Sequence, residues 1–390
     1  MKIVHICLTG GYTEGINYQE NYLTKYQALD GNDVSIITTQ YCWKKNVWKK
    51  CKESNYTNPY GVYVVRLPYK WAIPYRLNTY IGEFVGLYDE LCELEPDIIF
   101  IHNLQFWDLK KIDKYKKKHL DIKVYADSHT DFSNSARSWV SRNILYGLYW
   151  KRCAKIIEKD VIKFYGVLPV RVDFLKNVYG LPQKKLDLLV MGADDESVER
   201  VSKNKVRKRF REEYHIDDND FLIITGGKID AFKTQTLLLM KAIKSIKDET
   251  VKLCIFGSIE KKIRLQFDKL CDGNKIQYIG WANGDQSYDF FSAADLVVFP
   301  GRHSVYWEQV AGMGIPMVCK RWPGIDHIDY GGNVQFLDKD SVEEIKDILI
   351  KLLGFSETYQ KMLLAAQKEE RKQFSYKEIS RKAVGCERHF

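Results

Sequence analysis

Residues 221–233 read FLIITGGKIDAFK, and this stretch shows how the chain is built. An apolar run, Phe221–Thr225, reads as a buried strand and ends in two glycines and a lysine. Residues 2–15, KIVHICLTGGYTEG, follow the same order, with an apolar run and then a glycine loop that leads into the helical periodicity of Asn17–Leu29. A strand, a glycine turn and a helix form the opening of a βαβ unit, so the sequence predicts two such units, each with a loop able to approach a ligand.

Short apolar strands alternate with amphipathic helical stretches along the rest of the chain, as in parallel α/β sheets. In the first half the expected strands are Lys2–Leu8, Val34–Thr38, Val62–Leu67, Asp97–His102, Ile122–Ala126, Lys155–Glu158 and Leu186–Met191. In the second half they are Phe221–Thr225, Lys252–Phe256, Ile276–Ile279, Leu296–Phe299 and Pro316–Cys319. We therefore expect two Rossmann-like domains, 1–195 and 196–370, with a ligand cleft between them, and a helical tail, 371–390, that crosses back to the first domain.

The composition narrows the class of protein. Hydrophobic residues make up 45% of the 390 residues and charged residues 28%, which is typical of a globular protein. Lys and Arg number 60 against 51 Asp and Glu, a net charge of +9 that fits an anionic ligand or an acidic membrane surface. There is no concentrated basic block, so no nucleic-acid partner is expected.

The nine cysteines show no metal-ligand spacing, so free thiols in a reducing compartment and no metal site are expected. No apolar run reaches the roughly 18 residues of a membrane-spanning helix, which favours a cytoplasmic enzyme.

Two glycine loops are candidates for anion binding. The loop Thr9–Gly15 could bring backbone amides close to an anion, although it is neither a dinucleotide fingerprint nor a Walker loop and could be a plain turn. The second loop, Thr225–Lys233, contains Gly-Gly-Lys but has Ile229 where a Walker loop needs Ser or Thr. Its two ammonium groups, on Lys228 and Lys233, suit a diphosphate.

Two further loops carry polar groups after predicted strands. Ser304 has the position of an N-cap for a helix that runs to about Met313, so the amides near Ser304 would form a second anion site, with Glu308 one turn further on. His129 stands between Asp127 and Asp131, which is a pattern typical of an oriented polar or acid/base group. A purely structural role is the alternative for both.

In order along the chain, the loops resemble the motifs of glycosyltransferase family 4, a family of retaining enzymes with the GT-B fold. The first-domain fragments are Gly15–Asn17, Gly31–Ser35, Asp97–His102, Ser128–Thr130, Tyr179–Pro182 and Leu188–Asp194. Those of the second domain are Gly227–Lys233, Phe256–Ser258, Tyr278–Trp281, Ala294–Pro300, Glu308 and Gly314–Val318. The resemblance covers most of the chain.

The resemblance implies a metal-independent hexosyltransferase that moves a sugar from a nucleoside diphosphate, UDP, to a glycan acceptor. A lipid-linked acceptor in bacterial surface polysaccharide synthesis is the expectation, with no cofactor besides the donor substrate. The catalytic residues are then His129, Lys228 and Lys233, of which His129 orients the donor sugar. The donor would be held by Gly15, Lys228, Lys233, His303, Ser304 and Glu308, and the acceptor by Tyr12 and Asp131.

The sequence departs from the family at one place. The family has two glutamates eight residues apart, but Pro300 stands eight residues before Glu308, in a shortened loop. Glu308 keeps the predicted ribose contact, while His303 is the candidate that replaces the missing sugar contact, with backbone amides as the alternative. A nucleotide-sugar epimerase of the same fold and a non-catalytic nucleotide-sugar-binding relative remain open.

Residues 41–88 combine aromatic and basic side chains in a pattern that suits peripheral contact with anionic lipid on the inner face of the membrane. The aromatic members are Trp43, Trp48, Tyr60, Tyr63, Tyr69, Trp71, Tyr75, Tyr80 and Tyr88. The basic members are Lys44, Lys45, Lys49, Lys50, Lys52, Lys70 and Arg76. The alternative is a core-facing aromatic set with solvated lysines.

Overall fold

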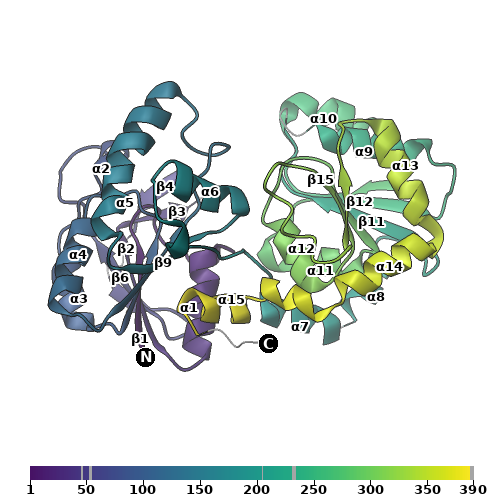
Figure 1. The fold of residues 1–390 in the computed structure, drawn as a ribbon. Coiled ribbons are helices and arrows are strands. Elements are labelled where there is room, and N and C mark those ends of the chain that lie inside the picture. Colours follow the sequence, from purple (N-terminus) through teal and green to yellow (C-terminus); the bar gives the residue numbers. More distant parts are fainter. Residues whose placement is uncertain (45–46, 52–54, 204, 231–233, 387–390) are drawn as a thin grey trace. The chain divides into compact units, whose positions relative to one another are not determined.

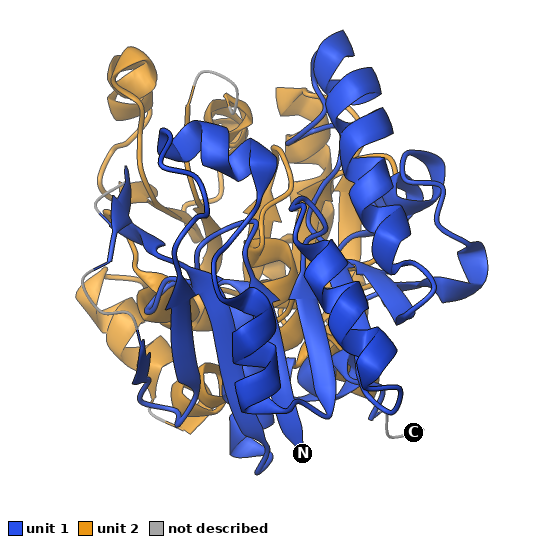
Figure 2. Cartoon of the chain, turned by 90° about the vertical axis from the view of Figure 1, so that its left-hand side faces the viewer, with its two compact units in different colours: residues 1–190, 376–390 blue, residues 191–375 orange. Residues whose placement is uncertain are grey.

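The computed structural model describes residues 1–44, 47–51, 55–203, 205–230 and 234–386. The chain forms two compact units (Figure 2). Unit 1 consists of Met1–Val190 and Tyr376–Phe390, and unit 2 consists of Met191–Ser375. The chain therefore leaves unit 1, builds unit 2 and returns to unit 1 at its C-terminal end, whereas the sequence placed these two passages near residues 195 and 370.

Unit 1 contains an eight-stranded sheet in the order β10-β9-β8-β7-β1-β2-β6-β5 (Figure 1). The strands are β1 (Lys2–Cys7), β2 (Asp33–Thr39), β5 (Asn55–Thr57), β6 (Tyr63–Leu67), β7 (Ile98–His102), β8 (Lys123–Ser128), β9 (Val161–Gly166) and β10 (Leu186–Leu188). All neighbours are parallel except β5, which pairs antiparallel with β6. Isoleucine and valine side chains on both faces of the central strands are buried, as expected of a parallel sheet covered on both sides.

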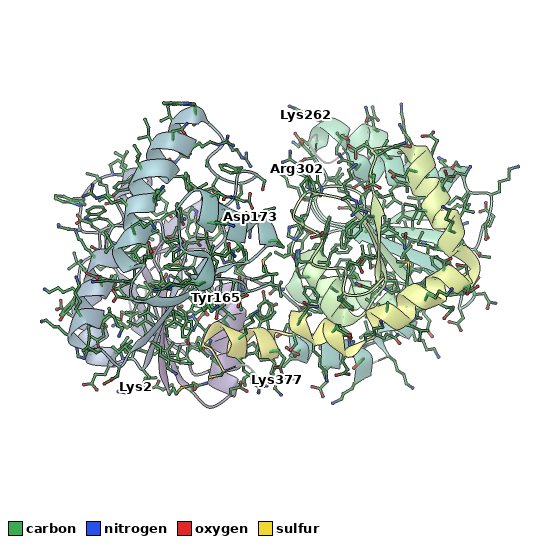
Figure 3. The ribbon with its side chains drawn as sticks, in the orientation of Figure 1. Lys2, Tyr165, Asp173, Lys262, Arg302 and Lys377 are labelled. Atoms are coloured by element: carbon green, nitrogen blue, oxygen red, sulfur yellow. A yellow bond between two sulfur atoms is a disulfide. The ribbon has the colours of Figure 1, made fainter. Side chains whose placement is uncertain are left out.

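The helical segments of unit 1 are α1 (Gln19–Leu29), α2 (Tyr75–Ile81), α3 (Leu87–Leu94), α4 (Leu109–Lys118), η1 (Ser141–Trp150), α5 (Lys151–Ile157), α6 (Pro169–Asn177), η2 (Gln183–Lys185) and α15 (Tyr376–Ala383). The last of these, α15, packs on the first, α1. The rings of Tyr22 and Tyr376 stack 4.4 Å apart, and Arg381 donates two hydrogen bonds to the Asp30 carboxylate. The hydroxyl of Tyr165 on β9, labelled in Figure 3, donates to the Lys382 carbonyl oxygen at 3.0 Å. The C-terminal helix is thus an integral part of unit 1.

Unit 2 contains a six-stranded parallel sheet in the order β13-β12-β11-β14-β15-β16. The strands are β11 (Phe221–Gly226), β12 (Val251–Phe256), β13 (Ile276–Tyr278), β14 (Leu296–Phe299), β15 (Met317–Lys320) and β16 (Val334–Leu337). The helical segments are α7 (Asp195–Lys203), α8 (Val206–Glu213), α9 (Gln235–Ser245), α10 (Lys261–Asp268), α11 (Gly284–Ala293), α12 (Tyr306–Met313), α13 (Val342–Leu352), η3 (Leu353–Phe355), α14 (Glu357–Ala366) and η4 (Glu369–Phe374). This strand order is that of a Rossmann fold.

One strand expected from the sequence is wrong. Lys155–Glu158 lies at the end of α5 and in the turn after it, and the strand of this region is β9, Val161–Gly166. The apolar residues that suggested a strand serve a helix, because Ile157 is completely buried on the inner face of α5. The short strands β5 and β16 were not expected.

The cysteine expectation also needs correction, because Cys42 and Cys51 form a disulfide with their Cα atoms 6.2 Å apart. The pair closes the antiparallel hairpin of β3 (Tyr41–Lys44) and β4 (Val47–Lys50). The remaining cysteines, seven in number, are free.

The aromatic residues of the 41–88 segment divide into two groups. Some pack on one another, as in the contacts of Tyr69 with Tyr75 and Phe84 and the edge-to-face pair of Trp43 and Trp48. Others are exposed, namely Tyr60, Trp71 and Tyr80. Across the described residues, no helix is both long and apolar enough to cross a bilayer.

Gly166 lets β9 pass close to α6. A Cβ atom at this position would lie 2.3 Å from the backbone nitrogen of Val172, and backbone cannot yield as a flexible side chain can. We expect Gly166→Ala to lower the free energy of unfolding of unit 1 by about 1–3 kcal/mol through overpacking. Urea denaturation followed by tryptophan fluorescence measures this loss.

Gly10→Ala is the matched control for this substitution, because a Cβ atom there meets nothing within 4 Å. Its effect is expected to stay within about 0.5 kcal/mol. Equal stabilities of the two variants would contradict the close-approach explanation.

Candidate functional site

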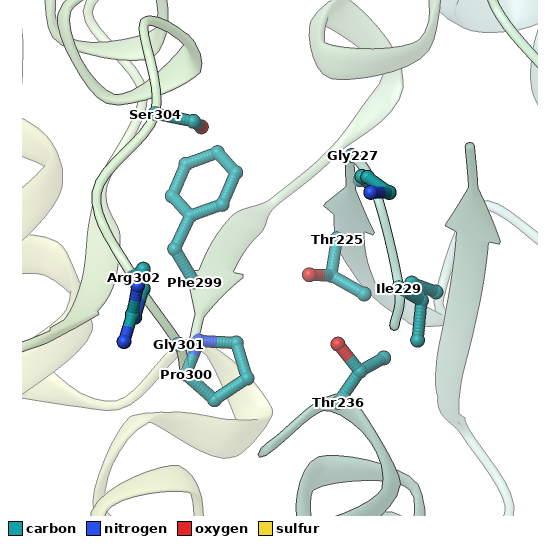
Figure 4. A pocket seen from close by; sticks show the side chains of 11 residues that line it. Thr225, Gly227, Ile229, Thr236, Phe299, Pro300, Gly301, Arg302 and Ser304 are labelled. Carbon is teal, nitrogen blue, oxygen red and sulfur yellow. The ribbon is translucent and has the colours of Figure 1, made fainter. Parts of the chain in front are cut away.

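The strand order of unit 2 reverses between β11 and β14, and a pocket lies at that point. In open parallel sheets the loops on either side of such a reversal diverge, which leaves room for a ligand at the carboxyl ends of the strands. The pocket is small and open to solvent, with a cavity volume of about 60 Å³, and Figure 4 shows the residues around it. It is lined by Thr225, Gly226, Gly227, Lys228, Ile229, Thr236, Phe299, Pro300, Gly301, Arg302 and Ser304. Two candidate loops from the sequence, those after β11 and β14, thus meet in one place.

Glycines allow the backbone to pack closely on one side of this pocket. Gly227 has φ of +126° and Gly257 has φ of +122°, a region that L-residues rarely adopt. A Cβ atom on Gly257 would lie 1.9 Å from the Gly227 carbonyl oxygen, so neither loop could hold its present course with a side chain there. At Gly227 the loop after β11 therefore presents backbone rather than a side chain to the pocket.

Cationic and hydroxyl groups make the pocket suitable for an anion. Lys228 is largely exposed, and its ammonium group pairs with Asp230 at 3.2 Å. Arg302 is exposed at the opposite loop (Figure 3), and Thr225 and Thr236 contribute hydroxyls from β11 and the first turn of α9. Lys233, the second predicted lysine, lies outside the described residues.

Ser304 lines the pocket but does not cap a helix, so the N-cap prediction is wrong. Helix α12 begins at Tyr306, and its N-cap residue is Val305, which makes no side-chain capping bond. Ser304 instead accepts a hydrogen bond from the Trp307 amide on its carbonyl oxygen at 3.0 Å. Because Val305 is the N-cap residue, Ser304 lies one residue before the cap, in the pocket loop. The predicted helix end is confirmed, because Gly314 has the left-handed conformation of a C-cap.

Glu308 lies fully buried behind the pocket loop, held by two histidines. Its Oε1 atom accepts from Nε2 of His303 at 2.7 Å and from Nε2 of His327 at 2.9 Å. Burial alone would raise the pKa of Glu308, but the two imidazoles outweigh it and hold the pKa well below the usual range. The other carboxylate oxygen, Oε2, is buried and has no partner among the described residues.

His327 was missed in the sequence, and the predicted sugar contact His303 has a defined partner in this structure. His303 lies against the edge of the Trp307 ring, with the ring centroids 5.1 Å apart. With Nε2 directed at Glu308, His303 can offer only Nδ1 to a ligand. No spacing signal marks His327, because it comes from a loop 19 residues beyond Glu308.

His129 lies at the corresponding edge of unit 1, where the strand order reverses between β1 and β7. It follows β8 and is partly exposed, with Nε2 3.6 Å from Oδ2 of Asp127. Its backbone nitrogen donates to Asn103 Oδ1 at 2.9 Å, and its carbonyl oxygen accepts from Asn134. His129 is therefore fixed at its backbone while its ring keeps access to solvent.

The two predicted acceptor contacts, Tyr12 and Asp131, have hydrogen-bond partners within unit 1. Tyr12 is 2% exposed, packs in a small apolar cluster and has its hydroxyl bonded to Asn58. Asp131 is buried, and its carboxylate binds Arg171 on one oxygen and the amide and hydroxyl groups of Ser133 on the other. Both side chains therefore have structural partners, and their contact with an acceptor stays a prediction.

Gly15 has φ of +71° in the loop before α1, and a Cβ atom at this position would meet nothing within 4 Å. It is exposed. The loop is therefore open, and the donor contact of Gly15 stays a prediction. In the part of the chain that the structure describes, no three His, Cys, Asp or Glu side chains gather in a way that could hold a metal ion.

Comparisons with known proteins agree with this architecture. Residues 206–369 match the family model described as "Glycosyl transferases group 1". No curated protein matches the sequence. The structure is similar to Anabaena HepE in complex with UDP, with a TM-score of 0.67, 14% identity and 98% of each chain covered.

Two further structures have comparable similarity. WaaG, described as a glycosyltransferase involved in lipopolysaccharide biosynthesis, has a TM-score of 0.62 at 13% identity, with 98% of this chain and 100% of that chain covered. UDP-GlcNAc 2-epimerase from Neisseria meningitidis bound to UDP-GlcNAc has a TM-score of 0.61 at 14% identity, with 99% of each chain covered. At these identities the likeness establishes the fold, and the predicted GT-B class with two Rossmann-like domains is confirmed.

The pKa of Glu308 predicts how its contribution to stability depends on pH. Because the folded-state pKa lies below the ordinary value of 4.5, the carboxylate contribution is fully present above about pH 4.5 and is lost as pH falls through the folded-state value. Glu308→Gln should therefore lower the free energy of unfolding at neutral pH by about 1–3 kcal/mol. The gap from the unsubstituted protein should narrow below pH 4.5. Thermal denaturation from pH 3 to 7 measures this, and a gap that widens in acid would contradict it.

Proposed function

We propose that the protein is a retaining, metal-independent hexosyltransferase that uses a UDP-sugar donor. The observation that carries the proposal is the pocket at the strand reversal of unit 2, where the backbone of Gly226 and Gly227 adjoins Lys228 and Arg302. Backbone amides and cations around an open hollow suit a diphosphate better than any uncharged ligand. The family match over residues 206–369 includes both loops of this pocket.

In the proposed reaction the bond between the sugar C1 atom and the β-phosphate oxygen breaks while the acceptor oxygen bonds to C1 on the same face. The acceptor proton passes to the departing phosphate oxygen, so charge and atoms balance. Lys228, Arg302 and Lys233 stabilise the negative charge that grows on the diphosphate, as oxyanion-stabilising groups do elsewhere. His129 orients the donor sugar. Glu308 is the residue proposed to contact the ribose.

The alternative is a nucleotide-sugar epimerase, which the likeness to the Neisseria epimerase favours. The two reactions differ in their need for an acceptor. An epimerase converts the nucleotide sugar by itself, whereas a transferase releases UDP only as sugar moves to an acceptor or, slowly, to water.

The test has two stages. Thermal shift against UDP, GDP, ADP and their sugars identifies the donor, because a ligand that binds only the folded state raises its melting temperature. The donor found is then incubated with and without polyprenyl-diphosphate-linked glycans, and products are analysed by NMR for anomeric configuration. An inverted product would contradict retention. Epimerised donor without an acceptor would favour the alternative.

Lys228→Ala and Arg302→Ala test the diphosphate site. Each should weaken UDP binding about ten- to a hundred-fold, because a charge-assisted contact contributes roughly 1.5–3 kcal/mol. Isothermal titration calorimetry measures the affinity. Lys262→Ala is the control, since Lys262 is an exposed lysine of α10 outside the pocket lining (Figure 3). Equal affinities in all variants would remove these cations from the site.

We further propose that the acceptor is lipid-linked, in bacterial surface polysaccharide synthesis, and that the cytoplasmic enzyme contacts the inner face of the cell membrane. An apolar ridge on unit 1 supports membrane contact. It consists of Trp139, Val140, Ile144 and Leu148, all exposed, at the start of the helix that continues into α5. The hydroxyl of Tyr149 in η1 donates to the Ile81 carbonyl oxygen of α2, whose exposed Tyr80 is thus close by.

The charge around the ridge matches an anionic bilayer. Residues 132–157 contain no Asp or Glu but five basic residues, Arg137, Arg142, Lys151, Arg152 and Lys155. Apolar residues that insert at the interface, together with lysines and arginines that meet anionic headgroups, are typical of a monotopic contact. This ridge lies outside the 41–88 segment that the sequence suggested.

The double variant Trp139→Ser/Leu148→Ser should lose most of its co-sedimentation with vesicles of equal parts phosphatidylcholine and phosphatidylglycerol. Trp281→Ser/Leu265→Ser on unit 2 is the matched control. Trp139 and Leu148 are 72% and 66% exposed, and Trp281 and Leu265 are 67% and 69% exposed. An equal loss of co-sedimentation in both double variants would indicate nonspecific hydrophobic adsorption instead of binding through a defined ridge.

A further inference from the structure

A line of buried polar side chains crosses unit 1 from the C-terminal helix to the loop that carries His129. Gln27 on α1 donates through Nε2 to the Ser380 carbonyl oxygen at 3.1 Å, and its Oε1 lies 2.6 Å from Nε2 of His5. Nδ1 of His5 lies 2.9 Å from Nε2 of His102. Nδ1 of His102 lies 2.9 Å from Oδ2 of Asp127. These four side chains are 4% exposed or less.

The parallel register explains why the line forms. His102 pairs directly with Asp127 across β7 and β8. His5 pairs with Phe100 across β1 and β7. His102 follows Phe100 by two residues on β7, so its side chain lies on the same face of the sheet as those of Phe100 and His5. The two imidazoles stack with centroids 5.2 Å apart.

Both ends of the line accept hydrogen bonds and cannot donate them. A backbone carbonyl oxygen terminates it at Ser380, and a carboxylate terminates it at Asp127. Rotating the Gln27 amide by half a turn is unfavourable, because two acceptors, the Gln27 and Ser380 oxygens, would then face each other. With the amide nitrogen directed at Ser380, the Gln27 oxygen is also an acceptor toward His5. The two histidines therefore stand between two acceptors.

Counting protons then fixes the charge. His5 needs a proton on Nε2 for Gln27, and His102 needs one on Nδ1 for Asp127. The contact between the two rings needs a third proton, on one side or the other. Three protons on two imidazoles make one of them an imidazolium.

We propose that His102 is this imidazolium, and that the line Gln27–His5–His102–Asp127 is a positioning network that holds His129 for the sugar. His102 is the member in contact with the Asp127 carboxylate, so the charge resides next to its counter-ion. The proton does not pass to Asp127, because its Oδ1 atom also accepts from the Asn103 amide at 3.1 Å, a hydrogen bond that favours the ionised form.

The surroundings agree with this assignment. Burial, with the adjacent His102, lowers the pKa of His5 to about 3, so His5 is neutral. Burial opposes a charge on His102, whereas contact with the Asp127 carboxylate raises its pKa. Cys7 itself is a neutral thiol, since burial raises its pKa. The titratable neighbours of His102 thus come from β1, with His5 and Cys7, and from β8, with Asp127.

The charged pair of His102 and Asp127 affects both the position of the His129 ring and the electric field around it. Oδ2 of Asp127 lies next to both His102 and His129. The His102 imidazolium compensates the charge of this carboxylate, and the Asn103 amide binds its other oxygen, Oδ1. His129 is therefore held with Nε2 toward Asp127 and Nδ1 available to a ligand. This role for His129 rests on the proposed function, whereas the protonation of His102 does not.

NMR of isotope-labelled histidine tests the charge directly. At neutral pH the unsubstituted protein should show one histidine, assigned by its loss in His102→Asn, with both ring nitrogens protonated, and His5 with one. Gln27→Leu removes the acceptor opposite His5 and so the need for the third proton. The doubly protonated fraction of His102 should fall in this variant. A singly protonated His102 in the unsubstituted protein, or an unchanged signal in Gln27→Leu, overturns the proposal.

Kinetics tests the positioning role. Asp127→Asn and His102→Asn should lower kcat for transfer roughly ten- to a hundred-fold, the loss expected when a reacting group is displaced by about an ångström. KM for the donor and affinity for UDP should change less than about two-fold, because the pocket of unit 2 is untouched. His119→Gln, which removes an exposed histidine of the same unit, should leave both constants unchanged.

The outcomes separate the two proposals. Absent UDP affinity and turnover in the unsubstituted protein, with a doubly protonated His102, would reject the proposed function and keep the charge assignment. Normal kcat in both folded variants would reject the positioning role. A fall in kcat with equal loss of UDP affinity would also reject it, since that result indicates general loss of structure. Circular dichroism confirms that each variant is folded.

Discussion

The reversal of strand order beside the first strand of each sheet is the constraint on which the positions of the candidate site residues depend. Neighbouring crossover helices leave in opposite directions there, so the carboxyl edge between β11 and β14, and that between β1 and β7, is not closed by the next helix. In unit 2 the gap holds the loops that end in Lys228 and Ser304. In unit 1 the strand next to the gap ends at His102, beside the strand that leads to His129. One topological rule thus positions groups that are far apart in the sequence.

The two sheets use this edge in different ways. In unit 2, glycines at 226, 227 and 257 bring backbone to the surface, and the charges at the pocket are exposed, as an arriving anion requires. In unit 1 the charged groups lie below the edge, where a low dielectric strengthens each contact and makes every unpaired atom costly. His102 and Asp127 are accordingly fully engaged. The exposed set suits binding, and the buried set suits orientation.

Much of the sheet architecture could be predicted from the sequence because parallel strands buried on both faces read as continuous apolar runs. That signal failed at Lys155–Glu158, where an apolar pair belongs to a helix, and it was too weak for the short strands β5 and β16. Pocket loops were found through glycine and lysine patterns. Contacts between residues far apart in the sequence could not be predicted in this way. His327 reaches Glu308 from a distant loop, and Asp131 binds Arg171 instead of facing solvent.

The C-terminal helix has a consequence that follows from hydrogen-bond polarity. Without α15 the Gln27 amide would lose the Ser380 oxygen and could turn, so its nitrogen could donate to His5. His5 would then accept on Nε2 and donate on Nδ1, and His102 could accept from it as a neutral ring. Docking of α15, fixed by Arg381 on Asp30, therefore forbids the neutral arrangement and retains one proton on the histidines. The segment that returns to unit 1 acts on the polar line through the direction of a single amide, without approaching His129 itself.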